Sequence, residues 1–484
     1  MEIILIIFLV TKINGGSSET IKIKFKTLKF LDNNSNNLIN IFDNNDFSSL
    51  EEKYFYYDLI LNNIYSEILI GSPPQKIIGF YSGKTEHFSI ISDKCFIQNS
   101  KYDKLLSNTF KNISEFNVCY KKYEGCCFAQ ENFMFESYDF NKNITFDNLK
   151  FFLTNTNKNN HNSCMVIGLR LNYQDMFIEN PKNFIYYLIH YFSTKKIINS
   201  YYWTMNFDNN QQINEGYISI GSPPHIYDPK NYRNKKFNEF NIQARYSTLN
   251  WVIQFNQLFL NKSNETIYLK KYNLEGHNCV FYPELNIILS TINYFNLIKN
   301  EFFNKFISSN ICFIQKIYIS EINSTIIEGF NGEYSLFNCD KEKVLDYGIN
   351  KFYSEFPSIN FYHSLLNFTF TLNASDLFYE DNKRNKIFFL IGTKNNDIDQ
   401  WVLGKTFMKK YQFVFNSEMK TIGYYTTIDN NTKNSNSNKV NYMKLIFIII
   451  IIIMIMKFLT LMVYRYRKII FKDKKSIALE MELI

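Results

Sequence analysis

The sequence predicts a mainly β body that is large enough for two cores. Between Tyr54 and Tyr425 the chain consists of short runs rich in Ile, Phe, Tyr and Val, which Gly, Pro and Asn separate, and few long helical periods occur. This pattern is typical of antiparallel β proteins. With 484 residues, of which 46% are hydrophobic, the chain exceeds one ordinary core, so we expect a two-lobed body with accessory segments.

The distribution of charge and of metal-binding residues excludes two classes of function. The formal net charge is +8, but the lysines are scattered among Asn, Ile, Phe and Tyr instead of lying on one helix or in one block. We therefore expect no nucleic-acid binding. The six histidines show no paired ligand spacing, and the eight cysteines form no CxxC pair, so we expect no metal site and no cofactor.

The N-terminus predicts entry into the secretory pathway. Residues 3–10 form a short apolar run, and small residues follow at positions 15–17, as in a signal peptide over residues 1–16. Glu2 departs from this pattern because a basic residue is usual there. The alternative is a buried strand at the N-terminus.

The C-terminus predicts a membrane anchor. Residues 445–464 form an apolar span that only Lys457 and Thr460 interrupt, and a helix of this length crosses the hydrocarbon layer. Basic residues follow at once in the tail, residues 465–484, which the positive-inside rule places in the cytosol. We expect a single-pass type I membrane protein whose body is lumenal or extracellular.

That compartment predicts disulfides and glycans. All eight cysteines lie between the predicted signal and the predicted span, which suits up to four disulfides of undetermined connectivity. Candidate glycosylation sites are Asn112, Asn143, Asn261, Asn264, Asn323, Asn367 and Asn373.

Two polar segments flank the body. Residues 17–53 form an Asn-rich leader or pro-like segment with an alternating run at 21–26, and an edge strand or a flexible leader is its simplest interpretation. Residues 427–444 are polar and have no apolar periodicity, which predicts a disordered stalk.

Five segments of the body resemble, in the same order, the pepsin-like aspartic peptidases of family A1. They are residues 64–75 with their Pro-Pro turn, 80–83, 166–169, 215–222 and, most specifically, 401–425. The second segment lies one residue closer to Gln75 than is usual in the family. The resemblance implies a pepsin-like fold in which two β-barrel-like lobes, residues 54–206 and 207–426, flank a cleft for an extended peptide. An unrelated β-sandwich is the alternative.

The resemblance also indicates which residues stand at the catalytic positions. The family uses two aspartates that share a proton and activate a water. Here tyrosines stand in both places, and the altered loops consist of Tyr81, Ser82 and Gly83 in the first and of Tyr282, Pro283 and Glu284 in the second. Pro283 and Glu284 replace the hydroxyl residue and the glycine of the family's second loop.

The resemblance and the sequence around the loops indicate further candidate residues. Tyr120 is a candidate flap tyrosine, with an ordinary strand residue as an equal alternative, and Cys312 and Cys339 resemble a bonded pair of the second lobe. Glu86 and Glu284 are the acids nearest the two loops; solvated side chains are the simpler interpretation, and a substitute catalytic acid is the alternative. His87 and the other histidines are expected on the surface or in the core.

Three classes of function follow from these assignments. The leading prediction is a non-catalytic A1 homologue, a pseudopeptidase, that binds a peptide or protein partner. The second is an active membrane-anchored aspartic endopeptidase. The third is a structural or adhesive surface glycoprotein.

Overall fold

A computed structural model describes most of the predicted body. The described residues are 20–28, 50–84, 88–92, 100–114, 126–139, 143–154, 163–170, 193–194, 197–207, 215–242, 250–262, 265–268, 278–319, 330–395, 400–427, 456–457 and 460. The chain forms two compact units, of which the first contains residues 1–233 and 237–425 and the second residues 234–236 and 426–484. The sheets, helices and core described below belong to the first unit, apart from residues 235–236 and 426–427 at the ends of two strands.

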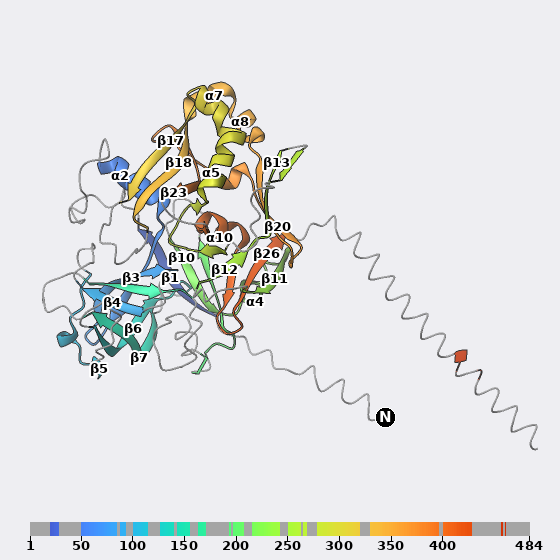
Figure 1. Ribbon diagram of the computed structural model, residues 1–484. Coiled ribbons are helices and arrows are strands. Elements are labelled where there is room, and N and C mark those ends of the chain that lie inside the picture. The colour runs from blue at the N-terminus through green and yellow to red at the C-terminus, as the bar shows by residue number, and fades with distance from the viewer. Residues whose placement is uncertain are drawn as a thin grey trace, which may run out of the picture. The chain divides into compact units, whose positions relative to one another are not determined.

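The described residues form three β-sheets, which confirms a mainly β body (Figure 1). The largest sheet contains thirteen described strands in the order β11 (Lys235–Asn241), β26 (Thr421–Thr427), β25 (Val414–Asn416), β9 (Tyr202–Phe207), β10 (Glu215–Gly221), β1 (Ile21–Leu28), β2 (Asn63–Ile70), β3 (Gln75–Ser82), β8 (Ser163–Gly168), β4 (Phe88–Ser92), β7 (Asn143–Thr154), β6 (Cys126–Glu136) and β5 (Lys111–Ser114).

The second and third sheets come from the later part of the chain. The second runs in the order β12 (Val252–Gln254), β15 (Asn278–Phe281), β24 (Trp401–Leu403), β16 (Ile288–Leu289), β23 (Ile391–Lys394), β18 (Gly332–Asp340), β22 (Lys386–Phe389) and β21 (Phe378–Asp381), with β17 (Cys312–Ile319) beside β18. The third consists of β14 (Glu265–Tyr268), β13 (Gln257–Lys262), β19 (Ser358–His363) and β20 (Phe368–Leu372).

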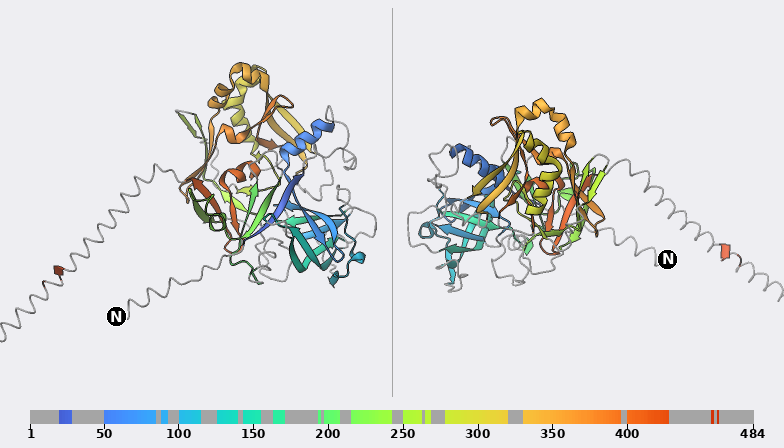
Figure 2. Two further views of the ribbon diagram at one scale, coloured as in Figure 1. Left: turned by 180° about the vertical axis from the view of Figure 1, so that it is seen from behind. Right: turned by 45° about the horizontal axis from the view of Figure 1, so that its top comes forward.

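Short helices connect these strands. They are α2 (Leu50–Ile60), η1 (Lys104–Leu106), α4 (Pro224–Tyr227), α5 (Ile292–Ile298), η2 (Lys299–Phe303), α6 (Asn304–Ser308), α7 (Lys341–Tyr347), α8 (Ile349–Glu355), α9 (Ala374–Leu377) and α10 (Lys405–Tyr411). Both views in Figure 2 show α7 and α8 beside β17 and β18, far from the blue and teal strands β3 to β7.

Two parts of the chain repeat one arrangement of three strands. In the first, β3 runs parallel to β8, and β8 runs antiparallel to β4. In the second, β15 runs parallel to β24, and β24 runs antiparallel to β16. The strands β3 and β15 end at the two predicted catalytic loops. We call residues 81–84 the first loop and residues 282–286 the second loop.

The interpretation of residues 21–26 as an edge strand or a flexible leader is wrong. Strand β1 lies inside the large sheet, where it pairs with β10 on one side and with β2 on the other. Ile23 and Phe25 are buried. The lysines on the other face form ion pairs with neighbouring strands, such as Lys24 with Glu136 at 3.2 Å and with Glu215 at 3.4 Å. The charged alternation therefore belongs to an interior strand.

The buried core is continuous from one sheet to the next. Among the described residues, the buried apolar side chains form a single cluster. Aromatic rings join the sheets: Trp203 of β9 stacks on Phe415 of β25 with centroids 4.4 Å apart, and Phe415 lies 5.6 Å from Phe281 of β15. Large aromatic side chains reach from one sheet to the next, which a count of apolar residues does not reveal.

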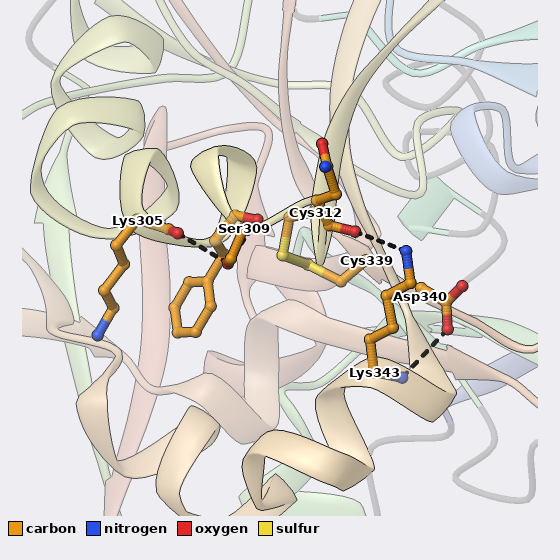
Figure 3. Close-up of a disulfide and its surroundings, with 8 residues drawn as sticks. Lys305, Ser309, Cys312, Cys339, Asp340 and Lys343 are labelled. Carbon is orange, nitrogen blue, oxygen red and sulfur yellow. Dashed lines mark hydrogen bonds between the residues drawn. A yellow bond between two sulfur atoms is a disulfide. The ribbon is translucent and has the colours of Figure 1, made fainter.

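The disulfide between Cys312 and Cys339 is present, as the resemblance implies. These residues pair directly on β17 and β18, and Figure 3 shows the bond beside the start of α7. Asp340 caps this helix by accepting from the Lys343 N–H at 3.2 Å. Cys164 is also disulfide-bonded, and Cys279 is a buried free thiol.

No helix among the described residues is long and apolar enough to span a membrane. Of the predicted span, only residues 456–457 and 460 are described. The predicted signal peptide lies outside the described residues, as do the stalk beyond residue 427 and the tail.

Candidate functional site

The two loops contact each other closely. A Cβ atom added to Gly83 would lie 3.1 Å from the carbonyl oxygen of Phe281 and 3.0 Å from Cδ of Pro283. These distances are shorter than ordinary van der Waals contacts, so a side chain at position 83 would require its neighbours at residues 281 and 283 to shift. The predicted site residues of both loops do meet in the folded chain.

Tyr81 points away from this contact and into the core. Its side chain is 3% exposed, and its ring packs edge to face on Phe25 of β1, with centroids 6.5 Å apart. Its hydroxyl lies 2.8 Å from Oγ of Ser66, which itself donates to the Lys24 carbonyl. Since the proton of Ser66 is used there, Tyr81 donates to Ser66. Burial raises the pKa of the Tyr81 hydroxyl.

Comparison of the two loops identifies Ser82, and not Tyr81, as the counterpart of Tyr282. Ser82 pairs with Gly168 at the end of β8. On the other side, Phe281 pairs with Leu403, the residue before Gly404. When the two glycines are aligned, Ser82 and Tyr282 take the same place. The sequence contained a signal of this difference, because the segment 80–83 lies one residue closer to Gln75 than is usual in the family. Successive strand residues face opposite ways, so one residue less exchanges the two sides of the strand.

Glu284 reaches from the second loop into the first. Its carboxylate accepts from the Gly83 N–H at 2.9 and 3.0 Å, from the Ser82 hydroxyl at 3.2 Å and from the Lys84 N–H at 3.3 Å. The side chain is 3% exposed, so the expectation of a solvated acid is wrong. A buried carboxyl group thus lies beside Ser82.

The backbone of the second loop is fixed by the segment that follows α2. The N–H of Asn62 donates to the Glu284 carbonyl at 2.6 Å, and its amide nitrogen donates to the Pro283 carbonyl at 2.9 Å. In return, the amide of Asn286 donates to the carbonyls of Asp58 at 2.6 Å and Leu61 at 3.1 Å. Helix α2 itself crosses residue 54, the predicted start of the first lobe.

Tyr282 is buried as well. Its ring packs edge to face on Phe330 with centroids 6.0 Å apart. The ammonium group of Lys84 lies over both rings, 3.6 Å from the centroid of Phe330 and 5.3 Å from that of Tyr282. This cation–π arrangement holds the aromatic side chain in place.

The titratable groups of the site have shifted pKa values. Burial raises the pKa of the Glu284 carboxyl, while its donors in the first loop, its own backbone N–H and the charge of Lys84 act in the opposite direction. Burial and the charge of Glu284 raise the pKa of Tyr282 to about 12, against the influence of Arg170 and Asn250. Neither tyrosine position therefore provides an ionised base in the acid range.

The remaining predicted site residues are only partly described. Tyr120, Glu86, His87, Asn264 and Asn323 lie outside the described residues. The described sequon asparagines are all exposed: Asn112, Asn143, Asn261, Asn367 and Asn373. The described residues contain no group of three or more His, Cys, Asp and Glu side chains arranged to hold a metal ion.

These features define a class of protein with two related strand–loop units whose loops meet at a buried polar centre. Residues 312–426 match the family model described as eukaryotic aspartyl protease. This match, from β17 into β26, confirms the resemblance to the aspartic peptidases for residues 312–426. None of the curated proteins matches the chain.

Proposed function

We propose that this chain is a non-catalytic A1 homologue that binds a peptide or protein partner. One observation carries the proposal: the equivalent positions of the two loops hold Ser82 and Tyr282, so the described residues bring no pair of carboxyl groups together at the contact. The aspartic mechanism needs two carboxyl groups that share a proton and hold a water. A phenol with a pKa of about 12 and a serine hydroxyl do not replace them.

An active peptidase is the alternative, and Glu284 is the observation that favours it. A buried carboxyl with a raised pKa resembles a general acid. However, its oxygens already accept hydrogen bonds from three residues of the first loop. A surface glycoprotein with an adhesive role is a third candidate, which the exposed sequon asparagines favour.

The purified full-length protein should not hydrolyse peptides by the aspartic mechanism. Loss of general acid–base help alone lowers a rate by about 10²- to 10⁴-fold, and here the shared proton is missing too. The measurement is cleavage of an unstructured peptide library between pH 3 and 7, with an active A1 peptidase assayed in parallel. Pepstatin-sensitive cleavage that survives Tyr282→Phe but is abolished by Glu284→Gln would establish the alternative.

The proposal includes a membrane anchor with the body outside the cytosol. Its support is the apolar span at 445–464 and the basic tail that follows. An epitope tag after Ile484 should become accessible to antibody only when the plasma membrane is permeabilised. The same tag inserted in the stalk, residues 427–444, is the matched control and should never face the cytosol. A C-terminal tag that antibody reaches on intact cells would refute this topology.

A further inference from the structure

The first loop presents three hydrogen-bond donors that converge on one carboxyl group. They are the hydroxyl of Ser82 and the backbone N–H groups of Gly83 and Lys84, at 2.9 to 3.3 Å from the oxygens of Glu284. Because they belong to successive residues, the backbone fixes where two of them point. Consecutive N–H groups arranged in this way form a binding site for anions, and charge-assisted bonds to a carboxylate are strong.

The group that fills this arrangement comes from the other loop. Glu284 is buried, so water does not compete with its carboxylate for these donors. The N–H of Asn62 donates to the Glu284 carbonyl and so fixes the backbone at this position. We propose that the first loop is a carboxylate-binding site and that Glu284 occupies it in cis, which fastens the second loop to the first. The inference holds whether or not the protein hydrolyses peptides, and its tests do not measure hydrolysis.

The charges around the site fit an anionic occupant. Burial raises the pKa of the Glu284 carboxyl, and the positive charge of Lys84 acts against this shift in favour of the carboxylate. Arg170, which follows β8, lies with Nη1 3.5 Å from the Lys84 carbonyl. Tyr282 also interacts with Glu284, and its hydroxyl stays neutral below its raised pKa. A carboxylate at this place therefore has cationic neighbours and no competing anion among these groups.

The test removes the occupant and supplies it again from solution. Glu284→Ala deletes a methylene and a carboxylate, and acetate contains the same heavy atoms. At pH 7 the melting temperature of the full-length variant should fall by on the order of 5 °C. Acetate should restore a large part of this loss, whereas acetamide, which has the same shape, and sodium chloride at equal ionic strength should not.

Hydrogen exchange provides a local measurement. The amides of Gly83 and Lys84 should exchange about tenfold faster or more in Glu284→Ala than in the unmodified protein, and acetate should slow them again. Glu131→Ala is the matched control. Glu131 is also a buried carboxyl, but it accepts from Tyr102 and Asn132 and does not reach the first loop. Its loss should leave the exchange at positions 83 and 84 unchanged.

Three outcomes would overturn the inference. They are unchanged exchange in Glu284→Ala, equal rescue by acetamide and acetate, and equal effects of the two glutamate variants at positions 83 and 84. If Glu284→Ala does not fold, Glu284→Gln decides the question, because it keeps the volume but turns an amide donor toward the N–H groups. Stability and exchange equal to those of the unmodified protein would then contradict the proposal.

Discussion

Tyr81→Asp should destabilise the protein by about 4 kcal/mol or more, although it introduces the residue type that the family uses. The ring of Tyr81 fills space in the core beside Phe25, and its hydroxyl bonds to Ser66. An aspartate leaves a cavity there and places a carboxyl group among apolar side chains. The measurement is denaturant unfolding at pH 7. At this pH the buried carboxyl group costs folding free energy whether it is ionised or has to take up a proton.

Tyr81→Phe is the matched control for this prediction. It keeps the ring and loses only the bond to Ser66, so its cost should be about 1 kcal/mol. A Tyr81→Asp variant as stable as Tyr81→Phe would show that the side chain of position 81 can turn toward the loops. The double variant Tyr81→Asp with Tyr282→Asp should likewise lose stability instead of gaining peptidase activity.

Gly404→Ala should cost about 3 kcal/mol, the upper range for overpacking. A Cβ atom at this position would lie 2.2 Å from the Ile287 carbonyl oxygen and 2.6 Å from that of Leu285. Both contacts are with backbone, and the Leu285 carbonyl already accepts from the Lys405 N–H at 2.7 Å. The second loop must therefore shift. Urea unfolding of the full-length protein measures the loss.

Gly79→Ala distinguishes a backbone clash from a side-chain clash. Its Cβ would meet the terminal methyl groups of Ile68 at 2.5 Å and Ile167 at 2.9 Å. These methyl groups can rotate away, so we expect a cost of about 1 kcal/mol. Equal losses for the two glycine variants would contradict the explanation from the rigid carbonyls of the second loop.

The sequence predicted the class of fold because local patterns and long motifs agreed. The run 401–425 contains β24, α10, β25 and most of β26. Strand β8, which ends at Gly168, and strand β24, which ends just before Gly404, pair with the strands that precede the two loops. These features depend on residues close together in the chain. The sequence therefore predicts them without any knowledge of which distant segments meet.

The sequence does not predict in this way that β1 is an interior strand or that the Glu284 side chain contacts the first loop. The alternation at 21–26 suits an edge strand as well as an interior one, and only the acids on neighbouring strands distinguish them. Glu284 meets donors about two hundred positions earlier in the chain. The resemblance placed the first loop one residue out of register, so Tyr81 was assigned to the side of the strand that Ser82 occupies. Only the pairing of Ser82 with Gly168 reveals this.

The interior place of β1 has a consequence for the nascent chain. Ile23 pairs with Ile218, so the ribosome must add roughly 200 residues before the main partner of β1 exists. At about 5 to 20 residues per second, this takes roughly 10 to 40 seconds. During that time most backbone groups of β1, a strand in which apolar side chains alternate with lysines, have no partner strand. Chaperones that shield such strands should therefore bind β1 first and release it when β10 emerges.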